Sequence, residues 1–332
     1  AGCTNPLQTG KLSTELLQQM IFPYLGAKRP DVLVHPGVGQ DCGVVDLGGE
    51  LAILSSDPIT TTGHNLGYLA VHISANDVAA TGAEPVGLLL TLLLPAGTAP
   101  AVVEEIMQQV HRAATGLGMA VLGGHTEFTA AVRQPVAAVT ALGKAQKGHF
   151  VTAGNGHPGD TLVLTKSAAC EGTAILAADL AAKLGPQLGA TLLERARAFI
   201  DRVSVVPEAR IAVKSATAMH DVTEGGVLGA VFELAHASGC GVELLADKVP
   251  VAEETASICR LLNLDPLGLI GSGSLLIATD NPENLITALS AAGIPAATIG
   301  QLLPKKEGLW LQLGQERQPL VVPERDELYK VL

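Results

Sequence analysis

The chain has 332 residues and a formal net charge of −11, with 48% hydrophobic, 16% charged and 3% aromatic residues. Nucleic acids and anionic membranes attract basic surfaces, and stacking on bases needs aromatic side chains, so this composition argues against both kinds of partner. So small a charged fraction indicates a large buried interior and contacts between subunits. The length suits two domains or one large domain.

The cysteines indicate a reducing compartment. None of the five forms a CxxC pair, and their positions are Cys3, Cys42, Cys170, Cys240 and Cys259. We therefore expect reduced thiols in a cytoplasmic protein, with no signal peptide at the start of the chain. The most apolar run, residues 86–97, is shorter than the roughly 20 residues that cross a bilayer, so no membrane span is expected.

The first half of the chain alternates predicted helices and strands. Residues 12–25 are predicted to form a helix that begins with Ser13 or Thr14 as its cap. A mostly apolar helix is expected over 66–83, and an amphipathic helix over 100–118. Four strands are also predicted, of which the third runs into a glycine turn: 51–57, 86–94, 119–128 and 133–143.

A polar, turn-rich stretch at 144–160 separates the two halves, and we place a domain boundary near 148–156. The predicted domains are residues 1–150 and 151–332. The second half begins with a strand at 161–167. Helices are then predicted near 171–184, 190–203 and 207–217, followed by a loop that leads into a helix over 220–239. Alternating strands and helices complete this half. Each half mixes strands and helices, so the fold class is α+β or mixed α/β.

Acidic residues recur at the ends of apolar segments or inside them. They are Asp41, Asp57, Asp77, Glu127, Asp221 and Glu224. A buried carboxylate without a partner is costly, so several acids on apolar elements require cations. Carboxylate oxygens suit Mg²⁺, which commonly binds through one or two carboxylates and the phosphates of a nucleotide. The pattern therefore favours a metal and phosphate site.

Glycines accompany these acids and would let backbone N–H groups approach phosphate oxygens. They are Gly37, Gly39, Gly43, Gly123, Gly124, Gly225 and Gly226. Simpler interpretations stay open: an aspartate at a strand end is often a turn residue, and Asp221 or Thr223 could cap the following helix. His125 could be a site residue or an ordinary surface histidine. Neither common nucleotide-binding glycine motif is present, which leaves other modes of nucleotide binding open.

The order and spacing of these segments resemble the aminoimidazole ribonucleotide synthetase (PurM-like) superfamily. Its members include the hydrogenase maturation protein HypE, selenophosphate synthetase and thiamine-monophosphate kinase, and the HypE branch is the most similar. The segments that carry the resemblance are GVGQDCGVVD, SSDPITTTG, LAVHISANDVAATGAEP, VLGGHTEFT, PGDTLVLTKS and MHDVTEGGVLGAVFELA.

The resemblance implies a homodimer in which the N-terminal domain builds a β-barrel with its copy and a C-terminal α/β domain flanks it. It implies ATP and Mg²⁺ in a cleft of the N-terminal domain, near the dimer interface. The implied chemistry is phosphoryl transfer from Mg²⁺-ATP to an amide, carboxylate or phosphate oxygen of a small-molecule or protein-borne acceptor. A hydrogenase maturation partner is also implied.

Three sets of site residues follow from the resemblance. The metal ligands would be Asp41, Asp57 and Asp77. The nucleotide would contact Gly39, Asp41, Asp77, Gly123, Gly124 and Thr126. The catalytic residues would be Asp221, which faces the acceptor, with Glu224 and His125, which stand where thiamine-monophosphate kinases carry aspartate.

The sequence also departs from its relatives. HypE proteins that make a nitrile group modify a cysteine at their own C-terminus, whereas this chain ends LYKVL and its last cysteine is Cys259. We therefore expect no reaction of that self-modifying kind. Cys3 stands too far before Lys11 to match the reactive residue of selenophosphate synthetase. Two alternatives remain: a small-molecule kinase similar to thiamine-monophosphate kinase, and a maturation scaffold without catalysis.

Overall fold

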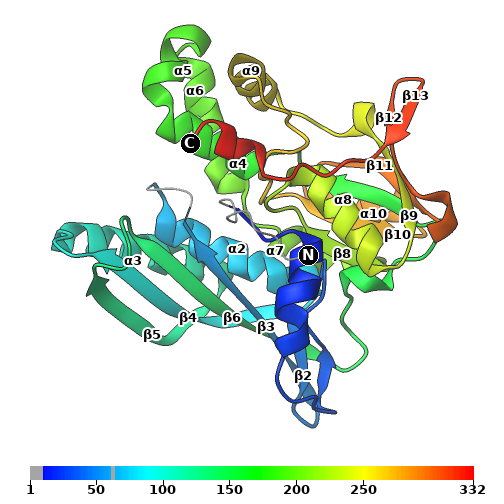
Figure 1. Cartoon of the computed structure of the whole chain (residues 1–332), viewed down its shortest axis with the longest axis horizontal. Coiled ribbons are helices and arrows are strands. Elements are labelled where there is room, and N and C mark those ends of the chain that lie inside the picture. Colours follow the sequence, from blue (N-terminus) through cyan, green and yellow to red (C-terminus); the bar gives the residue numbers. More distant parts are fainter. Residues whose placement is uncertain (1–9, 61–63) are drawn as a thin grey trace.

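The structure is a computed structural model that describes residues 10–60 and 64–332, so Cys3 lies outside the described residues. Two β-sheets, each covered by helices, form two adjoining layers of structure (Figure 1). The first sheet uses strands up to Gln146 and the second begins at Thr161. The mixed α/β class predicted from the sequence is confirmed.

The first sheet has six strands in the order β1-β2-β3-β6-β4-β5, with α2 and α3 over one face (Figure 1). Its pairs are antiparallel except for the parallel pair β4 and β5. The elements of this half are α1 (Thr14–Leu16), β1 (Val32–Val34), β2 (Gly43–Asp46), β3 (Glu50–Ile59), α2 (Leu66–Ala80), β4 (Glu84–Pro95), α3 (Pro100–Leu117), β5 (Ala120–Thr129) and β6 (Val136–Gln146).

The glycine turn predicted within 119–128 is wrong, because β5 is continuous through Gly123 and Gly124. These two residues have φ angles of 152° and 150°. Pairing with β4 sets Gly124 opposite Leu90, where an added Cβ would come within 1.8 Å of the Leu90 carbonyl oxygen. Glycine is therefore required for the close approach of two backbones, not for a turn.

The helix predicted over 12–25 is interrupted. Ser13 caps it as predicted, since its Oγ accepts a hydrogen bond from the backbone N of Leu16 at 3.4 Å. A π-helical stretch, Leu17–Ile21, and a 3-10 turn, Phe22–Tyr24, then follow. Proline at position 23 removes a backbone donor, so a regular α-helix is not continued here.

The second sheet has seven strands in the order β13-β12-β9-β11-β7-β10-β8. The helix predicted near 171–184 is divided at Leu180 between α4 and α5. The elements of this half are β7 (Thr161–Thr165), α4 (Cys170–Asp179), α5 (Ala181–Leu188), α6 (Ala190–Arg197), α7 (Val206–Ala212), β8 (Ala218–Asp221), α8 (Gly226–Ala237), β9 (Gly241–Leu245), α9 (Glu253–Leu262), β10 (Leu275–Thr279), α10 (Pro282–Ala291), β11 (Ala296–Leu303), β12 (Leu309–Leu313) and β13 (Glu316–Pro319).

The second sheet is apolar on both faces, which explains its continuous hydrophobic strands. On β7, Leu162 and Leu164 face the core that contains α8, whereas Val163 faces the core shared with the first domain. The same shared core contains α2, α7 and α10. The two halves therefore pack on one another through a common apolar interior.

Helix α2 lies at the centre of this interior, and 14 of its 15 residues are buried. Asn76 joins the halves, because its Nδ2 donates to the carbonyl of Val203 at 2.7 Å and its Oδ1 accepts from the backbone N of Val205 at 2.8 Å. A helix buried on all sides must place any charged side chain against another group. Asp77, the next residue, meets this condition at the cleft described below.

Candidate active site

A cleft of about 560 Å³ lies where the two halves meet. The loop before β2 contributes Asp41, strand β3 contributes Asp57, and helix α2 contributes Asp77. Asp221 stands at the end of β8, and Glu224 follows it in the loop before α8. The structure thus brings five of the predicted site acids into one cavity, from segments far apart in the sequence.

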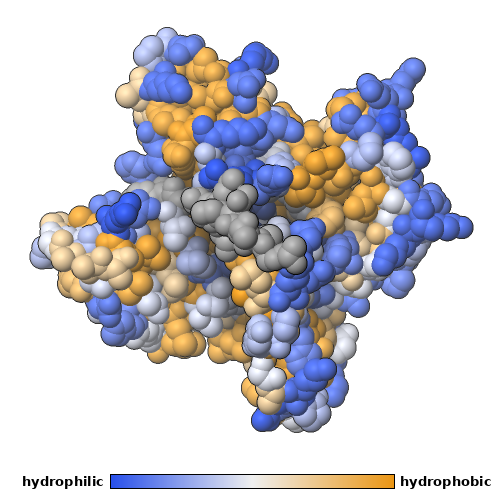
Figure 2. All heavy atoms as spheres, in the orientation of Figure 1, coloured by the Kyte–Doolittle hydropathy of each residue, from blue (hydrophilic) through white to orange (hydrophobic). Residues whose placement is uncertain are grey.

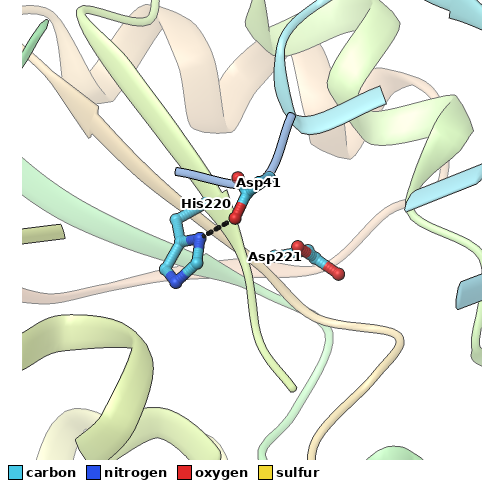
Figure 3. Close-up of side chains that lie close together, drawn as sticks. All are labelled: Asp41, His220 and Asp221. Carbon is cyan, nitrogen blue, oxygen red and sulfur yellow. Dashed lines mark ion pairs between the residues drawn. The ribbon is translucent and has the colours of Figure 1, made fainter. Parts of the chain in front are cut away.

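Three side chains at this cleft offer atoms close enough to share one cation: Asp41, His220 and Asp221 (Figure 3). The possible ligand atoms lie within 4.8 Å of one another. His220 Nδ1 is 2.5 Å from Asp41 Oδ1, and its Nε2 is 2.9 Å from Glu233 Oε2. Both ring nitrogens therefore face carboxylates.

His220 is better suited to positioning Asp41 than to binding a metal. Burial would lower the pKa of His220, but the contacts with Asp41 and Glu233 raise it well above its ordinary value. The imidazole is then protonated and has no lone pair for a metal. Its charge partly neutralises the acids around it and holds the Asp41 carboxylate in the cleft.

Asp77 and Asp57 are linked through a serine. The hydroxyl of Ser55 lies against both carboxylates, 2.9 Å from Asp57 Oδ2 and in close contact with Asp77 Oδ2. Burial, together with the charges of Asp221 and Asp57, raises the pKa of Asp77 well above its usual value. One hydroxyl proton cannot balance two carboxylates, so this pair requires protons or cations.

Asp221 also requires a proton or a cation, because one of its carboxylate oxygens has no partner. Its Oδ2 is buried without a hydrogen-bond partner. Burial, with the nearby charge of Asp41, raises the pKa of Asp221 to about 7. A cluster of carboxylate oxygens with this degree of unmet charge fits Mg²⁺, which prefers oxygen ligands and binds beside phosphates. Asp41 and Asp221 offer oxygen atoms close enough to share such an ion, and Asp57 and Asp77 line the same cleft.

Gly39 places the Asp41 loop against the second domain. The residue has φ of 73°, and an added Cβ would come within 2.5 Å of the carbonyl oxygen of Glu233 on α8. Only glycine permits this approach, which also brings Asp41 to His220. The predicted contact of Gly39 with nucleotide is untested, but its packing role is clear.

The loop after Asp221 is not a simple helix cap. Helix α8 begins at Gly226, and its N-cap is Gly225, which has φ of 90°. The backbone N of Gly225 donates to Asp326 Oδ2 at 2.7 Å, so a carboxylate from the end of the chain occupies the place of a cap. The interpretation in which Asp221 or Thr223 caps α8 is therefore wrong, and Asp221 is left to face the cleft.

Lys11 lies against this loop. Its backbone N donates to Glu224 Oε1 at 3.2 Å, and its Nζ donates to Thr223 Oγ1 at 3.1 Å. Desolvation of the ammonium would lower the pKa of Lys11, but Glu233, Glu224 and other nearby acids raise it. Although the residue as a whole is exposed, its ammonium lies in the cleft and supplies positive charge there.

Gly123, Gly124, His125 and Thr126 are the predicted site residues that do not line this cleft. All four are exposed on β5, at the edge of the first sheet. His125 Nε2 lies 3.0 Å from Glu127 Oε2 on the same strand. Within one chain they are separate from the acids, so their assignment to phosphate binding and catalysis stays a prediction.

Several residues of the cleft have no distinctive signal in the sequence. His220 directly precedes a predicted acid, but strand alternation would place it on the opposite face, so no signal favoured it. Glu233 lies in an apolar helix and could have been noticed by the same reasoning that selected Asp77. Glu171 and Ser272 also line the cleft, and no motif marks either residue.

Because several acids are buried, we expect the metal-free protein to lose stability as the pH rises. The pKa values of Asp221 and Glu171 are both about 7, raised chiefly by burial. Between about pH 4 and pH 7 the folded state therefore holds protons that an unfolded chain has released, so the free energy of unfolding falls across this window. His72, whose pKa burial lowers to about 4, opposes this trend below pH 6.5.

Denaturant titration without metal should give a free energy of unfolding about 1–3 kcal/mol lower at pH 8 than at pH 5.5. Asp221→Asn should reduce this difference, whereas Asp280→Asn, at an exposed site, should leave it unchanged. Added Mg²⁺ should restore stability at pH 8 by binding the ionised acids. Equal stability at the two pH values would contradict the burial of these charges.

The geometry defines a class of protein: two α/β domains with an acidic cleft between them. Known proteins with related sequences identify the family. Residues 39–145 match the AIR synthase related protein N-terminal domain, and residues 157–310 match the C-terminal domain of the same family. The chain belongs to the AIR synthase related family. The predicted superfamily is thereby confirmed.

Curated relatives extend along most of the chain. A putative hydrogenase expression/formation protein of Methanocaldococcus jannaschii is 25% identical over 97% of this chain and 97% of its own length. The carbamoyl dehydratase HypE of Escherichia coli is 28% identical over 83% of this chain and 81% of its own length. The names of these relatives agree with the predicted HypE resemblance and with an enzyme of this superfamily.

Solved structures confirm the PurM-like fold. The crystal structure of Escherichia coli HypE matches with a TM-score of 0.73 and 25% identity, covering 95% of this chain and 98% of that chain. A structure of HypE in complex with ATP matches with a TM-score of 0.69 and 22% identity, covering 96% of this chain and 97% of that chain. No helix among the described residues is both long and apolar enough to cross a bilayer.

Proposed function

We propose that the chain is a HypE-like enzyme that transfers a phosphoryl group from Mg²⁺-ATP to an oxygen atom of an acceptor. The observation that carries the proposal is the convergence of Asp41, Asp57, Asp77 and Asp221 in one interdomain cleft. Asp77 and Asp221 are buried, and their unmet charge is costly unless cations bind there. A purely structural role would not need four such acids in one cavity.

Bound Mg²⁺ would neutralise charge on the transferring phosphoryl group. Each acid of the cleft would then have a defined task. Asp57 and Asp77 would hold metal, with Ser55 fixing their orientation. Asp41 would hold metal under the control of protonated His220. Asp221 comes from the second domain and would orient the acceptor or a second metal.

Several findings on relatives support this function. One relative is a carbamoyl dehydratase by name, and one structural neighbour was solved with ATP. A further relative is named as a hydrogenase expression/formation protein, which supports an acceptor or partner in hydrogenase maturation. Activation of an amide oxygen by phosphorylation would suit a dehydration, because the phosphorylated oxygen becomes a leaving group.

We also propose that the enzyme is a homodimer formed through the open face of the first sheet. The face opposite α2 and α3 carries exposed Leu54 on β3 and exposed Leu89 on β4. The edge strand β5 adds exposed Val121, Leu122 and Phe128. Figure 2 shows apolar surface along the lower side of the molecule, where Figure 1 places this sheet. A long apolar edge strand invites pairing with another copy.

Such a dimer would give the exposed glycine segment a function. Gly123, Gly124 and Thr126 lie outside the cleft of their own chain, at the edge that the second copy would cover. We propose that they contact the nucleotide of the partner subunit. Their exposure in the single chain is consistent with a site completed only in the dimer.

Binding of a nonhydrolysable ATP analogue with Mg²⁺ tests the proposed function. At 100 times its dissociation constant, the analogue should raise the free energy of unfolding by about 2.7 kcal/mol, and only when Mg²⁺ is present. Crystals soaked with both should show metal beside Asp41, Asp57 and Asp77. Absence of nucleotide and metal from this cleft would refute the assignment.

An assay of ADP release then separates the classes of acceptor. Release that depends on thiamine monophosphate would favour a kinase, and release that depends on a carbamoyl-bearing acceptor would favour the dehydratase-like reaction. Binding of a maturation protein without any ATP turnover in the complex would favour a scaffold.

A further inference from the structure

The ammonium of Lys11 is held only loosely in the cleft. Lys11 is the sole lysine or arginine among the described residues that line this cavity. Within the part of the chain that the structure describes, its Nζ donates to the neutral hydroxyl of Thr223 alone, at 3.1 Å. The bond to Glu224 is made by the backbone N of Lys11, not by the ammonium. No carboxylate therefore fixes this positive charge by direct contact.

A second lysine shows how a permanent cation is held in this fold. Lys166 Nζ lies 2.6 Å from Glu208 Oε1, in a direct ion pair that is almost wholly buried. It also donates to three backbone carbonyls, those of Arg202, Ser204 and Gly273. Lys166 has fixed partners for its charge, whereas Lys11 has one hydroxyl.

The field of the surrounding acids keeps the Lys11 ammonium in the cleft. Desolvation would lower the pKa of Lys11, but four carboxylates raise it, in the order Glu233, Glu224, Asp221 and Asp77. Two of these acids, Asp77 and Asp221, also belong to the proposed metal site. Lys11 thus offsets, from a distance, the same charge that a metal would offset by direct contact.

A divalent metal would compete with Lys11 for this charge. Asp221 Oδ2 is buried without a hydrogen-bond partner, and Mg²⁺ prefers such carboxylate oxygens as ligands. An ammonium and a divalent cation in one cavity repel each other. The single hydrogen bond to Thr223 is a weak anchor against that repulsion, so the cleft cannot hold both cations tightly.

We propose that Lys11 is an exchangeable counter-ion, which occupies the cleft while no metal is bound and is displaced from Thr223 when a divalent metal binds. Lys11 is a positioning residue in this scheme, because it acts through the acids and not on a substrate. The inference rests on the proposed function, since it concerns the metal site of the same cleft. The coupling is reciprocal: the factor by which Lys11 weakens metal binding is the factor by which metal weakens the hold on Lys11.

Metal binding without nucleotide tests the first half of this coupling. Mn²⁺, a paramagnetic substitute for Mg²⁺, is titrated into the full chain, and free Mn²⁺ is measured by electron paramagnetic resonance. The titration is made at pH 8, because burial and the charge of Asp41 raise the pKa of Asp221 to about 7. Lys11→Met should bind Mn²⁺ about 10-fold more tightly than the wild type.

Lys144→Met is the matched control, because it removes the same charge from a different place. Lys144 Nζ lies 3.3 Å from Glu84 Oε2 at the protein surface, and neither residue lines the cleft. Its substitution should leave the affinity for Mn²⁺ at the wild-type value. The comparison separates a local effect of Lys11 from a change in net charge.

Tryptic cleavage between Lys11 and Leu12 tests the second half, because trypsin must take the lysine side chain into its own pocket. Saturating Mn²⁺ should raise the rate of this cleavage about 5-fold or more in the wild type. Cleavage after Lys214, which is exposed in the turn that follows α7, should not change. Thr223→Val removes the hydroxyl and keeps every acid, so it should show the faster cleavage at Lys11 without metal.

The possible results separate the two proposals. Equal affinity for Mn²⁺ in the wild type and Lys11→Met, or cleavage at Lys11 that does not respond to Mn²⁺, would overturn the inference and leave the proposed metal site intact. Binding of Mn²⁺ to neither protein would refute that metal site as well. If Lys11→Met does not fold, Thr223→Val decides the matter: its affinity for Mn²⁺ should exceed that of the wild type, and an unchanged affinity would overturn the inference.

Discussion

Asp77→Asn should lower Mg²⁺-dependent ATP turnover by about 100-fold or more, while the protein remains folded. Asparagine has nearly the same shape and keeps an oxygen that can accept the Ser55 hydroxyl bond, so packing of α2 is preserved. It removes the negative charge that would hold Mg²⁺. Because burial and the neighbouring acids raise the pKa of Asp77 well above its usual value, the metal-free variant should be at least as stable as the wild type at neutral pH.

The measurements are steady-state ADP release and thermal unfolding, with Ser74→Ala as the control. Ser74 lies one turn earlier on the same buried helix and does not line the cleft. Its substitution should leave turnover unchanged. Wild-type turnover in Asp77→Asn would remove Asp77 from the metal site, and lost turnover together with lost folding would assign it a structural role.

Much of the cleft could be predicted because buried charge is rare and therefore informative. Asp77 stands out inside an apolar helix, and Asp57 ends an apolar strand, so both required an explanation from the sequence alone. The two sheets follow from apolar runs of strand length, such as the run that became β4. The sequence pattern thus identifies charged residues on buried elements, because burying such a charge is costly and therefore rare.

The remaining site residues depend on contacts that no local pattern encodes. Lys11 reaches Thr223 across 212 positions of sequence. Ser272 lies in a glycine-rich loop whose composition signals only a turn. At Gly123 and Gly124 the local pattern is misleading: glycine preference favours a turn, but pairing with β4 extends the strand through both residues.

Thr126 is the residue through which the proposed dimer can be tested. Thr126 is exposed on β5, so Thr126→Asp should leave the subunit folded. In the proposed dimer it would place a negative charge beside the nucleotide phosphates of the partner subunit. We expect it to lower ATP turnover by about 100-fold, as repulsion replaces stabilisation at the transferring group. Light scattering would verify that the variant still dimerises, and full activity would exclude Thr126 from the site.

Mixing two inactive variants distinguishes a shared site from a site within one chain. When Asp77→Asn and Thr126→Asp subunits reassociate at random, about half of the dimers are mixed. In each mixed dimer, one cleft combines an intact Asp77 with the intact Thr126 of the partner subunit, and the other cleft carries both substitutions. Turnover should therefore recover to about a quarter of the wild-type value. Asp77→Asn mixed with Asp221→Asn is the control: both residues line the cleft of their own chain, so each cleft keeps one defect and no activity should return. Recovery in neither mixture would place the whole catalytic apparatus within a single subunit.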